Sequence, residues 1–240
     1  MSAKKPPPRP TPTRTPVRRT GRNWVFPTVI GVVVLAGVLA VVLSAVGGSD
    51  PTGPKAKLEV SPEVTVTGTA LPRYTGAATD PAVGLAAPEI GSVDFQARTS
   101  TAGGVTGKPY VLAFLAHWCP HCQAELPRLV AVERAGKNAG VPVVAVTTGT
   151  DQAAPNYPPS TWIAREKFRG DVLVDDKAQN AAQAYGLAGY PYLVWVGADG
   201  KVAARTSGEI PEEDLPAMFS ALAAGKPVPL PSSGASSNAG

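Results

Sequence analysis

The most informative stretch of this 240-residue chain is FLAHWCPHC, residues 114–122. It holds the chain's only two cysteines, Cys119 and Cys122, with Pro120 and His121 between them. A structural disulfide to a distant cysteine of the chain is therefore excluded. The pair follows an apolar run and precedes a helical pattern, and this arrangement is typical of a dithiol that cycles between reduced and oxidised states.

The two cysteines are expected to have different roles. Cys119 stands where the helix starts, and there the unpaired backbone N–H groups and the helix dipole favour an anion. The pKa of Cys119 should therefore fall, which makes this residue the predicted nucleophile. Cys122 lies one turn later and is the predicted resolving thiol. A bridge that closes so short a loop gains little chain entropy, which argues against a purely structural disulfide.

His121 bears on the direction of electron flow. It can donate a hydrogen bond or a positive charge to the Cys119 thiolate. A stabilised thiolate favours the reduced protein, so the disulfide becomes a stronger oxidant. An exposed histidine without a role is the alternative.

Strands and helices alternate along residues 84–225, the expected folded domain. Strands are expected at 109–116, 141–147, 171–174, 192–196 and 201–205, and helices at 119–138, 160–168, 178–185 and 211–223. This order predicts an α/β fold in which a mixed central sheet has helices on both faces.

The neighbourhood of the cysteines resembles the active-site segment of the thioredoxin fold. Pro127 lies five residues after Cys122, where thioredoxin-like proteins have a helix-kinking proline. Tyr190-Pro191, just before the expected hairpin, matches the position of their cis-proline. Further upstream, three short motifs are similar to the lead-in of the membrane-anchored TlpA/ResA branch: 87–90, 94–95 and 107–109.

The resemblance implies a thioredoxin fold and a redox-active disulfide between Cys119 and Cys122, with Pro120 and His121 completing the catalytic set. It also implies a substrate-binding surface made by Trp118, Tyr190 and Pro191. The TlpA/ResA branch usually carries Pro-Pro or Glu-Pro between its cysteines, whereas Pro-His is typical of DsbA-type oxidases. The dipeptide therefore favours oxidation of secreted proteins, and a reductase of the cytochrome c maturation type is the alternative.

Other polar residues are assigned structural roles. Glu125 is expected to be an exposed helix carboxylate, the alternative being a buried proton acceptor for Cys122. His117 is expected at the surface, and Asp175 and Asp176 are expected to cap the following helix. The sequence predicts no metal site and no cofactor.

Three other functions fit the sequence less well than redox activity. Cys119, Cys122 and His121 could carry copper(I), which soft thiolates suit, but the only methionines are Met1 and Met218. A peroxidase is disfavoured because no lone cysteine precedes the pair. Nucleic-acid binding is not expected, since the chain outside residues 1–23 has a net charge of −3.

The N-terminal part predicts a membrane anchor. Residues 1–23 form a basic, proline-rich tail without acidic residues, and 24–46 form an uncharged apolar stretch. Its 22 residues from Val25 to Val46 would make a helix ~33 Å long, enough to cross a bilayer. A cleaved signal peptide and a buried helix are the alternatives. The positive-inside rule places the tail in the cytoplasm and the domain outside it, where disulfides are usually permitted.

Residues 47–83 are expected to be a flexible linker, with at most one short strand within 58–66, and 226–240 a disordered tail. The sequence thus predicts a single-pass membrane protein with an extracytoplasmic thiol–disulfide oxidoreductase domain. Its expected partners are cysteine-containing secreted proteins, as substrates, and a membrane redox partner, either an oxidase or an electron carrier.

Overall fold

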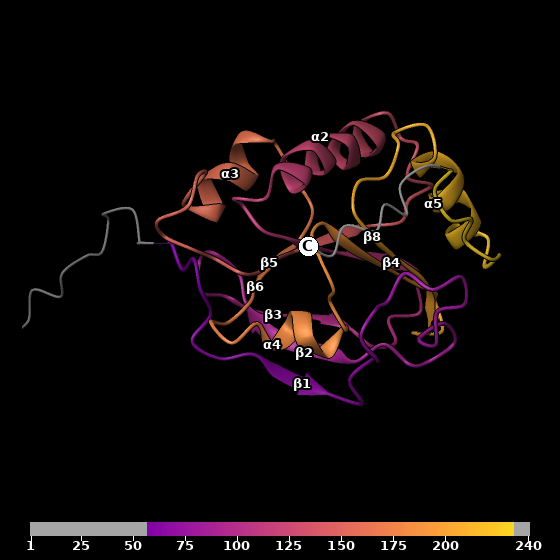
Figure 1. Cartoon of the computed structure of the whole chain (residues 1–240), viewed down its shortest axis with the longest axis horizontal. Coiled ribbons are helices and arrows are strands. Elements are labelled where there is room, and N and C mark those ends of the chain that lie inside the picture. The colour runs from indigo at the N-terminus through magenta and orange to yellow at the C-terminus, as the bar shows by residue number, and fades with distance from the viewer. Residues whose placement is uncertain (1–56, 233–240) are drawn as a thin grey trace, which may run out of the picture. The chain divides into compact units, whose positions relative to one another are not determined.

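A mixed sheet organises residues 57–232, the part of the chain that the computed structural model describes (Figure 1). The strand order is β1-β2-β6-β5-β4-β7-β8, and β3 pairs with β2. The strands are β1 (Thr65–Thr67), β2 (Glu89–Val93), β3 (Thr99–Gly103), β4 (Tyr110–Leu115), β5 (Val143–Thr147), β6 (Val172–Val174), β7 (Tyr192–Val196) and β8 (Val202–Ser207). The helices are α2 (Pro120–Arg134), α3 (Pro159–Arg165), α4 (Asn180–Ala184) and α5 (Leu215–Ala223).

The central strands β4, β5 and β6 run parallel, whereas β7 is antiparallel to β4, and β8 is antiparallel to β7. Every residue of β4 is buried, so its side chains supply apolar surface to both faces of the sheet. Val111, Ala113 and Leu115 pack into the core cluster that contains α2, α3 and α5. The alternate residues Tyr110, Leu112 and Phe114 pack into the second cluster, which contains α4.

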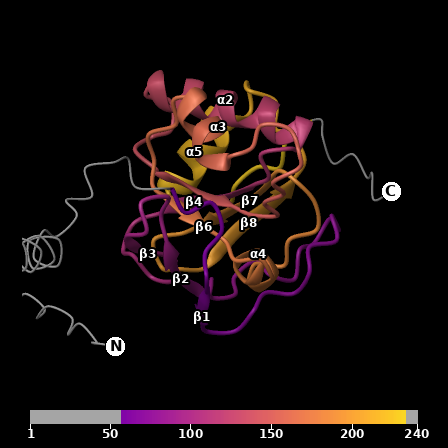
Figure 2. The same ribbon diagram turned by 90° about the vertical axis from the view of Figure 1, so that its left-hand side faces the viewer.

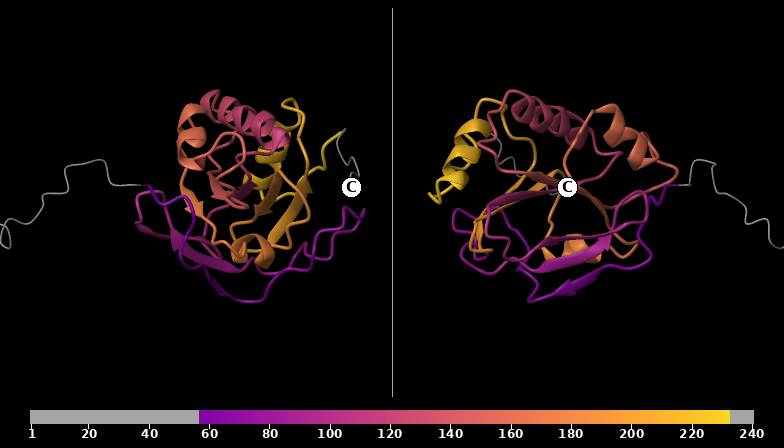
Figure 3. Two further views of the ribbon diagram at one scale, coloured as in Figure 1. Left: turned by 60° about the vertical axis from the view of Figure 1, so that its left-hand side comes forward. Right: turned by 180° about the vertical axis from the view of Figure 1, so that it is seen from behind.

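The helices cover both faces, as predicted. In Figures 1 and 2, α2, α3 and α5 lie on one side of the sheet, and α4 lies on the other side, next to the edge strand β1. The further views in Figure 3 show the same arrangement. The α/β class and the mixed sheet are confirmed. The carboxyl ends of β4, β5 and β6 meet at one edge of the sheet, and the chain leaves β4 there to enter the Cys-x-x-Cys segment.

The hairpin of β2 and β3 was not predicted from the sequence. The two strands pair over their whole length, from Glu89 opposite Gly103 to Val93 opposite Thr99. Their sequences, EIGSV and TSTAG, contain only one large residue that becomes fully buried, Ile90. The alternation of apolar residues that signals a strand is therefore weak here.

The expected linker at 47–83 is wrong for its described part, which packs against the domain. β1 pairs with β2, and Val64 and Leu71 are buried. Asp80 forms an ion pair with Arg205 of β8, whose side chain is fully buried. The backbone N–H of Ser160, at the start of α3, donates a 2.9 Å hydrogen bond to Glu59. These contacts hold the described part of this segment against the domain, although its composition is that of a flexible linker.

Within residues 57–232, no helix is both long and apolar enough to cross a membrane. The expected tail at 1–23 and the expected anchor at 24–46 lie outside the described residues. So does the greater part of the expected C-terminal tail, 233–240. The described residues 226–232 have no helix or strand, although Val228 is buried in the core cluster of α2 and α5.

Candidate active site

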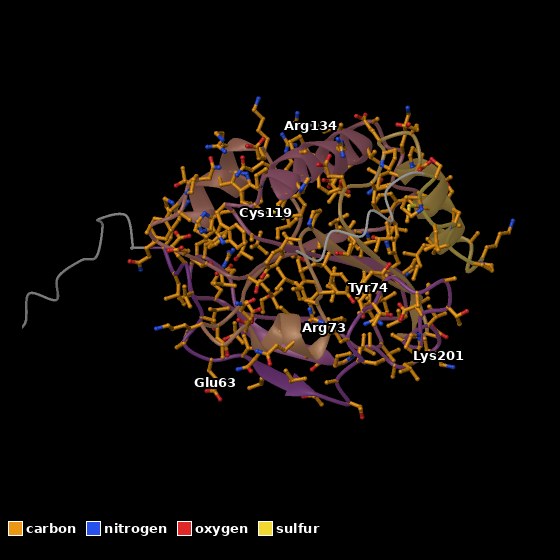
Figure 4. The ribbon with its side chains drawn as sticks, in the orientation of Figure 1. Glu63, Arg73, Tyr74, Cys119, Arg134 and Lys201 are labelled. Atoms are coloured by element: carbon orange, nitrogen blue, oxygen red, sulfur yellow. The ribbon has the colours of Figure 1, made fainter. Side chains whose placement is uncertain are left out.

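The cysteine pair lies at the N-terminus of α2. Cys119 occupies the N-cap position with extended backbone angles, φ −76° and ψ 120°, and Pro120 opens the helix. A proline costs no hydrogen bond there, because the first helical N–H groups have no partner in the helix. Figure 4 labels Cys119 at this end of α2 and Arg134 at the other. The Cys119 sulfur therefore lies at the positive end of the helix dipole.

Several neighbours stabilise an anion at Cys119. The Cys122 thiol donates a hydrogen bond to it, and the backbone N–H groups of Cys122 and His121 point toward it. Together with the charge of His121, these groups lower the pKa of Cys119 to about 6, although burial acts in the opposite direction. The residue is 6% exposed, so only a small part of it is open to a substrate sulfur.

Cys122 lies in the surroundings expected of a resolving thiol. It is fully buried, and its Sγ accepts a hydrogen bond from the backbone N–H of Ala116 at 3.4 Å. Burial raises the pKa of Cys122 strongly, and the neighbouring Cys119 raises it further. One cysteine therefore favours the thiolate and the other the thiol, and their roles as nucleophile and resolving thiol stay a prediction.

His121 lies at the surface and makes an ion pair that the sequence did not reveal. Its Nδ1 is 2.7 Å from Oε1 of Glu209, in the loop between β8 and α5. The hydrogen bond with Glu209 raises the pKa of His121, which favours the imidazolium. Arg128 of α2 contacts the other oxygen of Glu209, also at 2.7 Å. No local pattern around residue 209 could have identified this carboxylate, since tertiary folding alone brings it to α2.

Glu125 is fully buried, so the expectation of an exposed carboxylate is wrong. It occupies the buried stripe of α2 because it is three residues after Cys122 and one before Leu126. Its Oε2 accepts a 3.0 Å hydrogen bond from the N–H of Ile210, and its Oε1 has no partner among the described residues. Burial raises the pKa of Glu125 to about 7.

This carboxyl group acts electrostatically on the buried thiol, since its charge raises the pKa of Cys122. A carboxyl with a pKa close to neutral can accept or donate a proton at physiological pH. The alternative reading of Glu125, a buried proton acceptor for Cys122, therefore agrees with its location. In the sequence, the helical spacing from Cys122 to Leu126 and Leu129 was the sign that Glu125 could lie on the buried face of the helix.

The expected substrate surface comes together beside Cys119. The Tyr190–Pro191 peptide bond is cis, as predicted, and the carbonyl oxygen of Tyr190 lies 3.8 Å from the Cys119 sulfur. The ring of Trp118 meets the ring of Tyr190 edge-on, with centroids 5.7 Å apart. The indole N–H of Trp118 donates a 2.7 Å hydrogen bond to the carbonyl of Gly149. Both rings are partly exposed and form an apolar wall beside the thiol.

His117 is buried, contrary to the expected surface position. Its Nε2 accepts a hydrogen bond from the backbone N–H of Asp151 at 3.2 Å. Its Nδ1 therefore carries the proton and donates it to the carbonyl of Pro155 at 2.8 Å. The imidazole joins the segment before Cys119 to the loop that follows β5.

The acidic pair after β6 has the capping role that was predicted. The carboxylate of Asp175 accepts hydrogen bonds from the N–H groups of Ala181 and Ala182, and that of Asp176 accepts one from Asn180. Across residues 57–232, no three histidine, cysteine or acidic side chains gather as metal ligands would.

The chain is similar to known proteins over this same region. Residues 83–205 match the AhpC/TSA family. The thiol-disulfide oxidoreductase ResA of Bacillus thuringiensis (strain Al Hakam) is 27% identical over 134 residues, which cover 55% of this chain and 74% of that protein.

Two solved structures also align with the chain. One is the thioredoxin domain of a thiol-disulfide oxidoreductase from Bacteroides vulgatus, with 22% identity and a TM-score of 0.48, covering 59% of this chain and 98% of that one. The other is a secreted disulfide oxidoreductase from Mycobacterium tuberculosis, with 27% identity and a TM-score of 0.42. This alignment covers 49% of this chain and 84% of that one.

The family match spans just over half of the chain, runs from before β2 into β8, and includes both cysteines and the cis-proline. The chain therefore belongs to the AhpC/TSA family of thioredoxin-like proteins, and within it is a thiol–disulfide oxidoreductase of the TlpA/ResA type.

Proposed function

We propose that the chain is a membrane-anchored, extracytoplasmic oxidoreductase that introduces or exchanges disulfides in secreted proteins through Cys119 and Cys122. We infer the oxidising direction from one observation, the set of groups that stabilise the Cys119 thiolate. A stable thiolate stabilises the reduced protein, which makes the Cys119–Cys122 disulfide a better oxidant. The imidazolium of His121 adds to this effect because Glu209 favours its protonated form.

The first step forms a mixed disulfide. A substrate thiolate attacks the sulfur of Cys119, which is the more exposed of the two cysteines. The S–S bond to Cys122 breaks, and the Cys122 sulfur leaves with the electron pair. It then takes a proton, because a buried thiolate is strongly disfavoured. Glu125, with a pKa of about 7 and a location behind Cys122, is the proposed proton donor.

The second step completes the transfer of two electrons. A second substrate thiolate attacks the substrate sulfur of the mixed disulfide, which creates the new disulfide in the substrate. Cys119 leaves as a thiolate, and a thiol with a low pKa is a faster leaving group. Trp118, Tyr190 and Pro191 would hold an extended substrate chain during both steps, since their rings and backbone lie beside the Cys119 sulfur.

The proposed location depends on the sequence. The apolar stretch at 24–46 is long enough to span a bilayer, and the basic residues of 1–23 favour a cytoplasmic N-terminus. A domain on the outer side of the membrane meets thiols of newly exported proteins. A membrane oxidase would then restore the Cys119–Cys122 disulfide after each cycle. Protease treatment of intact cells tests this topology, because only an extracytoplasmic domain would be digested.

The reduction potential tests the oxidising direction. Equilibration of the full chain with glutathione buffers should give a value between ~−180 and ~−120 mV, the range of oxidising thioredoxin-fold proteins. A value close to ~−270 mV, as in thioredoxin, would instead support the alternative, a reductase of the cytochrome c maturation type supplied by a membrane electron carrier. Trapping of thiols in growing cells gives a second readout, with mostly disulfide expected for an oxidant.

Copper(I) transport remains the third possibility. His121 pairs with Glu209 rather than joining the two sulfurs as a ligand. Titration of the reduced full chain with copper(I) should therefore show no tight binding of one ion per chain. Tight stoichiometric binding would support the carrier function in place of disulfide exchange.

A further inference from the structure

A row of four ionisable side chains links the surface of the active site to its buried end. His121 contacts Glu209 at 2.7 Å, and Glu209 contacts Arg128 at 2.7 Å. Arg128 in turn lies 3.6 Å from Oε2 of the buried Glu125. Three of the four side chains belong to α2, and Glu209 alone comes from a distant part of the chain.

The loop that carries Glu209 is fixed on both sides of this residue. The N–H of Gly208 donates a 2.9 Å hydrogen bond to the carbonyl of Pro191, the cis-proline. The N–H of Ile210 donates a 3.0 Å hydrogen bond to the carboxyl of Glu125. Glu209 is thus held between the proposed substrate loop and the proposed proton donor, and its two oxygens face different cations.

We propose that Glu209 is a positioning residue that holds His121 and Arg128 in place, and so couples the thiolate of Cys119 to the buried carboxyl of Glu125. This inference depends on the proposed redox role of the cysteine pair. It assigns part of the control over the Cys119 thiolate to a residue more than eighty positions away in the sequence, outside the Cys-x-x-Cys motif.

At the outer end, Glu209 would act on Cys119 through His121. The pKa of Glu209 is lowered by its hydrogen bonds with His121 and Arg128, so it stays a carboxylate at neutral pH. The carboxylate raises the pKa of His121 and so favours its protonated form, and the imidazolium lowers the pKa of Cys119. Removal of the Glu209 charge should lower the pKa of His121 and so weaken the thiolate.

At the inner end, Glu209 would act on Glu125 through Arg128. The charge of Arg128 lowers the pKa of Glu125, whereas the charge of Glu209 raises it. Without Glu209, the guanidinium would have Glu125 as its remaining carboxylate partner in this row. Both effects favour the ionised form of Glu125, so its pKa should fall. The protein would then lose proton-donating capacity at the same time as thiolate stability.

The test is a double-mutant cycle on the full chain in detergent, with Glu209→Gln, His121→Asn and the double variant. The midpoint of the pH dependence of Cys119 alkylation should rise by about 0.3–0.7 pH units in Glu209→Gln, the range expected for one exposed ion pair. In the His121→Asn background, the same change should leave the midpoint unaltered. The control Glu212→Gln removes an equal charge from the same loop at an exposed position and should change nothing.

A carboxyl NMR titration gives the inner readout. The midpoint for Glu125 should move to lower pH in Glu209→Gln and stay in place in Glu212→Gln. An equal rise of the alkylation midpoint in both His121 backgrounds, or no rise in either, would overturn the coupling. An ordinary thiol pKa at Cys119 in the unmodified chain would instead contradict the proposed function, so the two failures are distinguishable.

Discussion

Cys119 and Cys122 lie one helical turn apart, yet their surroundings move their pKa values in opposite directions. Hydrogen bonds from Cys122 and from the first backbone N–H groups of α2 lower the pKa of Cys119 to about 6. Burial raises the pKa of Cys122. The site therefore holds one anion and one proton, and this asymmetry is what disulfide exchange requires of the pair.

The first prediction separates the roles of the cysteines. Cys119→Ser should abolish disulfide exchange, because the accessible sulfur is lost. Cys122→Ser keeps the nucleophile but removes the thiol that reverses the first step by attacking the Cys119 sulfur of a mixed disulfide, so covalent adducts formed with substrate disulfides should accumulate. Non-reducing gels of exported proteins would show these adducts. Adducts in the Cys119→Ser chain in place of the Cys122→Ser chain would reverse the assignment.

The second prediction concerns His121. Replacement by proline gives the Pro-Pro dipeptide that the TlpA/ResA branch usually carries, and removes the imidazolium beside Cys119. The pKa of Cys119 should rise, and the reduction potential should fall by about 30 mV for each unit of that rise. Glutathione equilibration measures the change. His121→Asn serves as a control that removes the charge without adding a ring, and an unchanged potential in both variants would exclude this role.

The third prediction concerns the buried carboxyl. The pKa of Glu125 is about 7 in the fold, which is above its ordinary value of 4.5. Its contribution to stability is therefore fully present below pH 4.5 and is lost as the pH rises through 7. Glu125→Gln stays neutral, so the variant should gain about 2–3 kcal/mol relative to the unmodified chain between pH 4.5 and pH 8.

Urea denaturation of both chains at these two pH values measures that difference. The same substitution should slow disulfide exchange, because Cys122 loses its proposed proton donor. A stability difference that is the same at both pH values would mean that Glu125 has an ordinary pKa.

The fourth prediction concerns the segment before β2. Arg205 is fully buried and pairs with Asp80, and it also donates to the carbonyls of Pro72 and Tyr185. Arg205→Met should cost about 3–5 kcal/mol, because it leaves a carboxylate without its partner. Asp80→Asn in the same chain should recover part of the loss. Urea denaturation measures both, and an additive effect of the two changes would contradict the pairing.

The local structure around the cysteines followed from the sequence because it depends on neighbours along the chain. The apolar run of β4, the cysteine at the N-cap and the helix of α2 are all contiguous. The cis bond before Pro191 could be predicted only through the resemblance to thioredoxin-like proteins.

The remaining parts depended on contacts between distant residues. In the sequence, Glu125 looks like an ordinary surface glutamate. In the fold it lies on the buried face of α2 with Cys122 and Leu126, and the loop that carries Ile210 covers it. Glu209 has no signal of its own in the sequence. The segment from 57 to 83 has the composition of a linker, and the ion pair of Asp80 with a residue 125 positions later holds it to the sheet.

The most direct test of the account is the pH dependence of Cys119 alkylation in the reduced full chain. We expect the rate to follow an ionisation with a midpoint near pH 6, as the lowered pKa of Cys119 requires. A midpoint at about 8.5, the value of a free cysteine, would contradict the stabilised thiolate and with it the oxidising role.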